Sequence, residues 1–294
     1  MPHRLIVVIG PTGVGKSAYA IRLAQDLHCP IISSDSRQVY RGMTIGTDAP
    51  RESLLNTIPH YLVACREVWQ PYSASDFAHD AERLLDDFAP IYPDIVMVGG
   101  SMLYLQALLF GLSDAPAASP EVRQALWREY HAYGATPLRE RLKVVDPVYL
   151  SQIDPNNHKR IIRALEVYET TGKPFSSYHK ESYPRPLGYD VELHLVTRPR
   201  PQLYERINAR VAQMMDRGLV EEVKRLAPYR NENALNTIGY KEVFQYLDGD
   251  IPLHEAQSLI AKHTRTYARQ QISFFTKWCK EGSPFRYQIV SLTD

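Results

Sequence analysis

The first residues along the chain that could do chemistry are the run GPTGVGKS, from Gly10 to Ser17. The run matches the pattern G-x-x-x-x-G-K-[S/T] at every fixed position. It follows a short apolar stretch and precedes a helical pattern, which is the context that this motif requires. Backbone N–H groups, a helix N-terminus, the Lys16 ammonium and the Ser17 hydroxyl can together bind a polyphosphate, and the hydroxyl is also a ligand for Mg²⁺. We therefore expect a phosphate-binding loop that consists of Gly10, Pro11, Thr12, Gly13, Val14, Gly15, Lys16 and Ser17.

One carboxylate, that of Asp35, stands at the end of a predicted strand, the run Pro30–Ser34. In nucleotide-hydrolysing proteins, an acid at the end of another apolar strand usually helps to hold Mg²⁺. Here the run Asp94–Gly100 ends in two glycines followed by Ser101, without an acid. Asp35 could be the Mg²⁺ ligand of an NTPase or kinase, a general base that takes a proton from an incoming nucleophile, or a helix N-cap. The spacing is compatible with all three.

Short apolar runs alternate with helical patterns at both ends of the chain, which indicates a parallel sheet in an α/β core. Between the tract Asp114–Pro120 and Val191, helical patterns follow one another without a strand. We therefore expect a P-loop-type core flanked by helices, formed by 1–120 and 190–294, with an all-helical insertion at 121–189. The predicted strands are Leu5–Ile9, Pro30–Ser34, Asp94–Gly100 and Val191–Thr197.

The chain ends in a long predicted helix, from about Pro252 to Lys280. Ile260, Tyr267 and Gln271 fall near one face, which is the pattern of a helix packed on a core. Basic residues lie on another face and could meet RNA.

The composition indicates a globular protein without a membrane-spanning helix. Of 294 residues 44% are hydrophobic and the formal net charge is +1, and no apolar run approaches the roughly 20 residues that a membrane helix needs. The first part of the chain is acidic and the rest mildly basic, which is compatible with a polyanionic partner. Three widely separated cysteines without a CxxC pair favour a reducing compartment. We expect a cytoplasmic monomer.

Beyond the phosphate loop, an ordered set of segments resembles the bacterial tRNA dimethylallyltransferase family, the isopentenyl-tRNA transferases. The set continues with DSRQVYRGMTIGT, VGGSMLYLQALLFGL, KRIIRALEVYETTGKP, YERINARVAQMMDRGLVEEV, TIGYKEVFQYLDG and TRTYARQQISFF. No later segment is decisive alone, but their order along nearly the whole chain is very specific. The resemblance implies transfer of a dimethylallyl group from dimethylallyl diphosphate to N6 of the adenine just 3′ of the tRNA anticodon, with release of diphosphate.

The resemblance also implies roles for single residues. The loop would hold the diphosphate with Mg²⁺, in part through Ser17, and no acid would be needed to aim water at a γ-phosphate. Asp35 matches the carboxylate that relieves the amine of its proton, Ser101 matches a threonine that positions the adenine, and Arg210 matches an arginine for diphosphate or transition-state binding. The tRNA contacts of the family fall on Asp35, Ser36, Arg37, Gln38, Ser101, Arg123, Lys159, Arg160, Ile161, Ile162 and Arg163.

The family's core contains a channel that admits the prenyl donor from one side and an extruded base from the other. The insertion and the final helix would grip the anticodon stem. Two departures from the family pattern concern these contacts. Near the end, Gln270, Ser273 and Phe274 replace an arginine, a threonine and a tryptophan, and Ala49 stands where a lysine is usual.

Two other functions explain part of the sequence. A nucleoside or nucleotide kinase would share the loop, the α/β core and an arginine-bearing helical insertion, but it leaves the strand end at Gly99–Ser101 unexplained. A non-catalytic ATPase switch would need RNA affinity that depends on the nucleotide. The order of the motifs favours the transferase.

Overall fold

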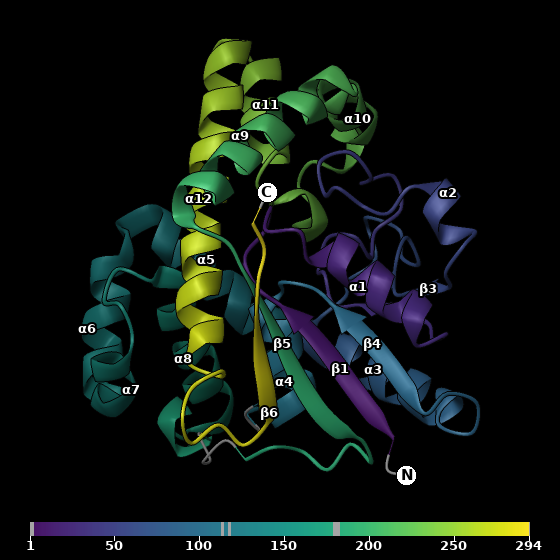
Figure 1. Cartoon of the computed structure of the whole chain (residues 1–294). Helices are drawn as coiled ribbons and strands as arrows, with labels where there is room; N and C mark the ends of the chain where they lie inside the picture. Colours follow the sequence, from purple (N-terminus) through teal and green to yellow (C-terminus); the bar gives the residue numbers. More distant parts are fainter. Residues whose placement is uncertain (1–2, 113–114, 117–118, 179–182, 294) are drawn as a thin grey trace. The chain divides into compact units, whose positions relative to one another are not determined.

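The computed structural model describes residues 3–112, 115–116, 119–178 and 183–293 (Figure 1). The chain forms two compact units. The first consists of Met1–Phe110 with Pro184–Asp294, and the second of Gly111–Tyr183.

The helical unit therefore begins and ends earlier than the predicted 121–189. Ala115 already packs against the core of the helical unit. At the other end, Leu187 and Tyr189 pack against the core of the first unit, and the Tyr189 hydroxyl donates a hydrogen bond to Leu85 O at 2.6 Å. The boundaries of the unit depend on which core these side chains pack against. The tract of prolines and alanines in the sequence does not reveal this.

The described part of the first unit contains one parallel sheet of six strands, in the order β3-β2-β4-β1-β5-β6 (Figure 1). This confirms the predicted fold class. The two edge strands were not predicted, because β3 has only two residues and β6 is polar and exposed. The strands are β1 Arg4–Ile9, β2 Ile31–Ser33, β3 His60–Tyr61, β4 Asp94–Val98, β5 Asp190–Thr197 and β6 Arg286–Ser291.

Helices cover both faces of this sheet, and this explains why its central strands are apolar without alternation. Leu5, Val7 and Ile9 of β1 belong to a core shared with α3 and α4, whereas Val8 points into a second core with α1 and α9. The helices of this unit are α1 Lys16–Asp26, α2 Glu52–Leu55, α3 Ala74–Phe88, α4 Met102–Phe110, α9 Arg200–Asp216, α10 Leu219–Leu226, α11 Tyr240–Leu247 and α12 Leu253–Thr276, with 3₁₀ turns at Ala227–Tyr229 and Asn233–Leu235.

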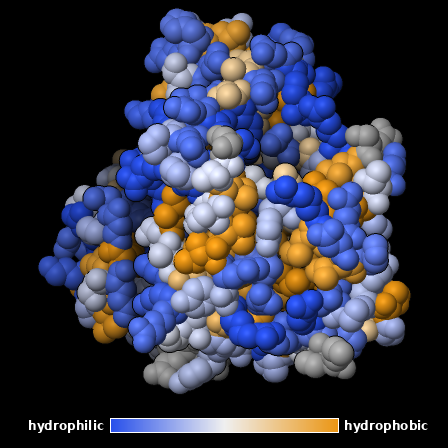
Figure 2. Space-filling view, viewed as in Figure 1, coloured by the Kyte–Doolittle hydropathy of each residue, from blue (hydrophilic) through white to orange (hydrophobic). Residues whose placement is uncertain are grey.

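On the face that Figure 2 shows, hydrophobic residues reach the surface in the middle of the view. The exposed large hydrophobic side chains of this unit include Tyr287 and Ile289 of β6. Among the described helices, none is long and apolar enough to cross a bilayer.

The position of β1 determines where a ligand can bind. β1 lies between β4 and β5, with β2 and β3 beyond one neighbour and β6 beyond the other. In such a sheet, ligands bind outside the carboxyl ends of the strands at the point where the strand order reverses. The segments that follow β1, β2 and β4 are the phosphate loop, Asp35 and Gly99–Ser101, so the topology brings the predicted residues to one place.

The described residues of the second unit form helices only, as predicted. They are α5 Pro120–Tyr133, α6 Ala135–Val145, α7 Pro147–Gln152 and α8 His158–Thr171, with a 3₁₀ turn at Phe175–Tyr178. Leu126, Leu142 and Leu165 lie in its core. The buried Asp146 joins two of its segments, because its carboxylate accepts hydrogen bonds from Tyr149 N at 3.0 Å and from Ser176 N at 2.8 Å.

Candidate active site

The phosphate loop has the backbone that its glycines allow. Gly10, Gly13 and Gly15 have φ values of 143°, 81° and 110°, which side chains with a Cβ rarely adopt. A Cβ on Gly10 would also lie 2.4 Å from Val196 O. α1 begins at Lys16 without a side-chain cap on its N-terminal N–H groups. The loop therefore presents a helix N-terminus to an anion.

Lys16 is held across the loop by a hydrogen bond from Nζ to Pro11 O at 2.8 Å. Burial and, to a lesser degree, the nearby Arg210 lower the pKa of Lys16 to about 7, while Asp35 opposes the shift. A lysine so poised becomes fully charged when a phosphate approaches.

Gln271, on α12, connects the segments that follow two neighbouring strands, β1 and β4. Its Oε1 accepts a hydrogen bond from Thr12 N at 2.8 Å, and its Nε2 donates one to Gly100 O at 2.9 Å. A Cβ on Gly100 would lie 2.3 Å from that Nε2, so any other residue there would displace the Gln271 amide. Tyr267, one turn earlier, also donates to Gly100 O, at 3.2 Å, and burial raises its pKa to about 12. The phosphate loop is thus tied to the turn after β4 through α12.

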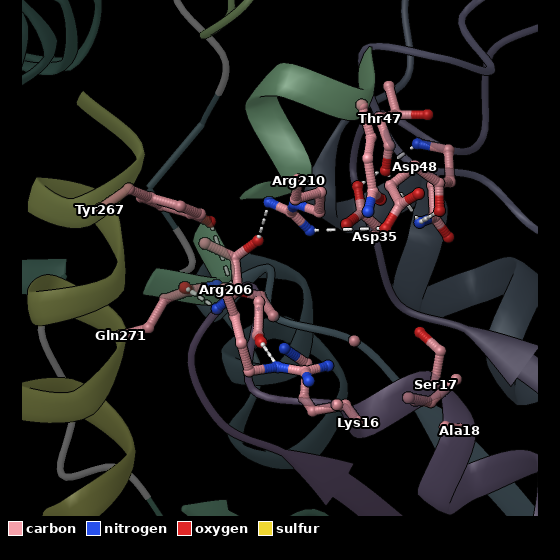
Figure 3. Close-up of a pocket in the computed structure, with 18 of the residues that line it drawn as sticks. Lys16, Ser17, Ala18, Asp35, Thr47, Asp48, Arg206, Arg210, Tyr267 and Gln271 are labelled. Carbon is pink, nitrogen blue, oxygen red and sulfur yellow. Dashed lines mark hydrogen bonds and ion pairs between the residues drawn. The ribbon is translucent and has the colours of Figure 1, made fainter. Parts of the chain in front are cut away.

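Arg210, predicted to bind the diphosphate, projects from α9 toward the loop (Figure 3). Its Nη2 donates a hydrogen bond to Thr12 Oγ1 at 2.7 Å, and its Nη1 lies 3.6 Å from an oxygen of Asp48. Arg217 lies 3.5 Å from the other oxygen of Asp48. Burial lowers the pKa of Arg210, but a guanidinium keeps its charge in proteins. Asp48 therefore pairs with two arginines, of which Arg210 reaches the phosphate loop.

Asp35 stabilises the turn that follows it, residues 36–39, with one carboxylate oxygen. Its Oδ1 accepts hydrogen bonds from Arg37 N at 2.8 Å and Gln38 N at 3.3 Å. Ser101 Oγ accepts another from Ser36 N, at 2.7 Å, and fixes the same turn to the end of β4. The helix N-cap weighed in the sequence is therefore wrong, because residues 36–39 form a turn and not a helix, and Asp35 fixes that turn through Oδ1. Among the described residues, no hydrogen-bond donor to the second oxygen is found, which leaves that oxygen able to accept a proton.

Two pockets open on these residues. The first has a volume of about 370 Å³ and contains Lys16, Ser17, Asp48 and Arg206 from the loop and its surroundings. The second, of about 230 Å³, is lined by the turn Asp35–Arg37 and Ser101, and by apolar side chains of α9 and α12. Both are lined by Thr12, Asp35, Thr47, Arg210 and Tyr267. A phosphate pocket and a mixed polar–apolar pocket therefore meet around the Asp35 carboxylate.

The sequence did not single out several of these residues as functional. Asp48, Thr264 and Gln271 line the pockets, and Gln271 was assigned to core packing. The signal was available on α12, where Thr264 and Gln271 are buried polar residues in line with the buried Ile260 and Phe275. Polar groups on a buried face need partners, and here a pocket and the phosphate loop lie against that face.

The residues of the helical unit that were expected to contact tRNA fall into two groups. Arg123 binds the buried Glu166 with two hydrogen bonds, at 2.8 and 3.1 Å, and Arg163 lies 3.5 Å from the same carboxylate. Lys159 and Arg160 are exposed at the start of α8. The side chains of Ile161 and Ile162 are buried in the core of the unit, so they hold α8 in place, while Lys159 and Arg160 remain exposed.

The departures near the end of the chain lie away from both pockets. Gln270, Ser273 and Phe274 line a separate open groove with Arg269 and Lys277. Phe274 packs on Phe275 and Trp278, with ring centroids 5.4 and 5.0 Å away. Ala49 donates its N–H to Thr44 O and follows Asp48, so the loop that lacks the usual lysine carries an acid beside the arginines.

A phosphate loop at the switch point of a parallel sheet, with a carboxylate where a second pocket meets it, defines a P-loop-type group-transfer enzyme. Comparison with known proteins identifies the family. The sequence profile described as IPP transferase matches residues 38–278. The chain therefore belongs to the IPP transferase family.

Individual relatives agree. The chain is 41% identical over 275 residues to the tRNA dimethylallyltransferase 2 of Parabacteroides distasonis, covering 94% of this chain and 92% of that one. A solved structure of a tRNA isopentenylpyrophosphate transferase from Bacillus halodurans is 32% identical, with a TM-score of 0.68 over 99% of this chain and 91% of that one. A eukaryotic dimethylallyltransferase acting on tRNA is 25% identical, with a TM-score of 0.78 over 98% of this chain and 74% of its own.

Proposed function

We propose that this protein transfers the dimethylallyl group of dimethylallyl diphosphate to N6 of the adenine 3′ of the anticodon in tRNA and releases diphosphate. The observation that carries the proposal is that the phosphate pocket and the second pocket share Asp35, Thr12 and Arg210. A donor bound through its diphosphate and an acceptor base can therefore reach each other at one carboxylate. The names of the relatives support the choice of donor and acceptor.

The donor is assigned to the first pocket. The loop N–H groups, Lys16, Arg206 and Arg210 surround a space in which a diphosphate would be neutralised from several sides. The donor's reactive carbon then lies toward Thr12 and Asp35, where the two pockets meet.

The acceptor base is assigned to the second pocket. Val211, Met214, Ile238 and Ile260 offer apolar walls for a flat ring. Thr264, on the same wall, is only 7% exposed, and its hydroxyl makes no hydrogen bond to another described residue. A purine, which has ring nitrogens on its edges, could form a hydrogen bond with this hydroxyl.

The chemistry is a substitution at carbon. The N6 lone pair attacks C1 of the dimethylallyl group, the C1–O bond breaks, and its electron pair leaves with the diphosphate. The attacking nitrogen gives its proton to the free oxygen of Asp35, whose other oxygen stays bound to Arg37 N and Gln38 N. Lys16, Arg210 and the loop N–H groups stabilise the charge that develops on the leaving group.

Mg²⁺ is the metal that these residues would suit. It is usually bound by one or two carboxylates together with substrate phosphates. Ser17 is exposed in the first turn of α1, and the carboxylates of Asp35 and Asp48 line the same pocket. When bound, the ion would lower the charge of the leaving diphosphate.

The helical unit is proposed to hold the anticodon stem. Lys159 and Arg160 are exposed there, and the side chain of Arg123 is 55% exposed beside Glu166. Such cations bind phosphates without reading sequence. A monomer acting in the cytoplasm fits an RNA-modifying role, and three free cysteines suit that compartment.

The test is to incubate the protein with Mg²⁺, dimethylallyl diphosphate and unmodified tRNA, digest the RNA, and search by mass spectrometry for N6-dimethylallyl-adenosine. Asp35→Asn keeps an oxygen for Arg37 N and Gln38 N but removes the base. We expect it to lower kcat by about 10²–10⁴ and to leave diphosphate affinity nearly unchanged.

An ATP reaction with small phosphate acceptors runs in parallel. Phosphoryl transfer without prenylated adenosine would indicate a kinase, in which the loop binds ATP, and would refute the proposal.

A further inference from the structure

A buried carboxylate of α10 binds the segment Met43–Asp48, called here loop 43–48. Glu222 is 0% exposed. Its Oε2 accepts hydrogen bonds from Ile45 N at 2.7 Å and from Thr44 N and Oγ1 at 3.0 Å each. Its Oε1 accepts one from Gly46 N at 2.9 Å and one from the Tyr240 hydroxyl at 2.7 Å. Five donors converge on one side chain, which matches an ionised carboxylate, a group that only accepts.

The other end of loop 43–48 belongs to the site. Thr47 lines both pockets, Gly46 lines the second and Asp48 the first. The carbonyls of Thr47 and Asp48 accept hydrogen bonds from the Gln38 side chain at 3.1 and 3.3 Å. The Asp48 carboxylate lies beside Arg210, which in turn donates to Thr12. A continuous set of contacts thus runs from Glu222 to the phosphate loop.

Tyr240 packs closely against loop 43–48. A Cβ on Gly46 would lie 2.6–2.9 Å from the Tyr240 ring and hydroxyl, so the loop lies flat on the ring at a glycine. Tyr240 is fully buried, and burial together with Glu222 raises the pKa of its hydroxyl. The hydroxyl therefore stays a donor to Glu222.

We propose that Glu222 is a positioning residue for both substrates, because its carboxylate fixes the loop that places Thr47 and Asp48 where the two pockets meet. The roles of the pockets rest on the proposed function, but the effect of Glu222 on the loop does not. The backbone N–H groups of Thr44, Ile45 and Gly46 all point to one anion, as in a loop that binds an anionic ligand. Here the anion is part of the protein, so the loop is preformed before any ligand arrives.

The test uses Glu222→Gln, which keeps the size of the side chain but turns one acceptor oxygen into a donor. That NH₂ group must face either the amides of Thr44 and Ile45 or the Gly46 amide and the Tyr240 hydroxyl. Glu221→Gln is the matched control, because Glu221 is the neighbouring residue on α10, is exposed, and among the described residues forms an ion pair with Lys224 of the same helix alone. Tyr240→Phe removes a single donor from Oε1 and serves if Glu222→Gln does not fold.

The first readout is amide hydrogen exchange, which does not depend on the reaction. We expect the amides of 44–46 to exchange about tenfold to a hundredfold faster in Glu222→Gln than in the wild type. In Tyr240→Phe we expect a change in exchange rate at the Gly46 amide alone, because this amide shares Oε1 with the Tyr240 hydroxyl. The second readout is steady-state kinetics. Because the loop lines both pockets, KM should rise for the prenyl diphosphate and for tRNA, at temperatures where the variant is fully folded.

Unchanged exchange at 44–46 in Glu222→Gln, or in Tyr240→Phe if the former is unfolded, would overturn the inference. So would wild-type KM values for both substrates with a lowered melting temperature only, since that is the pattern of a merely structural residue. If the wild type transfers no prenyl group, the proposed function fails, whereas the exchange experiment still decides the role of Glu222.

Discussion

Gln271 accepts a hydrogen bond from the backbone N–H of Thr12 at 2.8 Å, so a helix near the end of the chain holds the phosphate loop near its beginning. The same side chain donates to Gly100 O at 2.9 Å, and Gly100 precedes Ser101, which fixes the turn that carries Asp35. One amide therefore links the phosphate loop to the segment that fixes the turn of Asp35, the proposed general base.

Replacing Gln271 should impair catalysis more than folding. Gln271→Met keeps the volume but leaves Thr12 N without its partner, at roughly 1–3 kcal/mol, and leaves Gly100 O with the Tyr267 hydroxyl as its donor. We expect kcat/KM to fall about tenfold or more, as measured by steady-state prenyl transfer. Gln270→Met, on the exposed side of the same helix, should behave as the wild type. Equal losses in both variants would mean that α12 acts through its stability.

The pKa of Lys16 predicts a pH dependence of diphosphate affinity. In the free protein this pKa is lowered to about 7, and a bound diphosphate favours the ammonium and raises it. Below pH 7 the lysine is already charged and its contribution to affinity is constant. Above pH 7 binding must take up a proton, so Kd should rise by up to about tenfold per pH unit until the pKa of the complex is reached.

Calorimetric titration of diphosphate with Mg²⁺ between pH 6 and 9 would measure this. Lys16→Arg keeps its positive charge at all these pH values. The ionisation of the diphosphate itself affects both proteins equally, so the difference between their Kd curves reports the titration of Lys16. Parallel curves for wild type and variant would contradict the assigned pKa.

Thr264 should affect the acceptor without affecting the donor. Thr264→Val preserves the shape but removes the hydroxyl that faces the second pocket, so a hydrogen bond to the base is lost, worth about 0.5–1.5 kcal/mol. We expect KM for an anticodon stem-loop to rise several-fold at constant KM for dimethylallyl diphosphate. Thr266→Val is the control, because its hydroxyl bonds to Lys262 O on the exposed side of α12. A change in donor KM alone would place the prenyl chain in that pocket instead.

The parts of this fold that the sequence predicts are those encoded locally. The phosphate loop, its strand and its helix follow from one short motif, and Asp35 comes to the site because parallel strands end at a common edge. Helix α3 was not predicted, although Ser73 and Asp76 form a capping box, with Asp76 accepting from Ser73 N at 2.8 Å. That S-x-x-D signal was present in the sequence.

The residues that escaped prediction act over long sequence separations. Glu222 lies in LVEEVKRL, which looks like a solvated helix, yet its spacing from Leu219 and Val223 puts it on their buried face. Only the fold shows that the loop amides 176 to 178 residues away need its charge. The same holds for Gln271 and Thr12, which are 259 residues apart. A single sequence can reveal a polar residue on the apolar face of a helix, but it does not reveal which distant residue that side chain binds.

The cations of the helical unit should separate into binding and structural residues. Lys159 and Arg160 are exposed, so Lys159→Ala with Arg160→Ala should weaken tRNA binding, lower the salt dependence of log K by about one for each phosphate that no longer meets a cation, and leave the melting temperature unchanged. Arg163 donates to Ala115 O and Pro116 O and lies over the Phe175 ring, so Arg163→Ala should lower the melting temperature as well. Filter binding of an anticodon stem-loop at several salt concentrations, together with thermal unfolding, would measure both effects. Undiminished binding of the double variant would show that the start of α8 does not contact tRNA, because the unchanged melting temperature means that only the two exposed charges are lost.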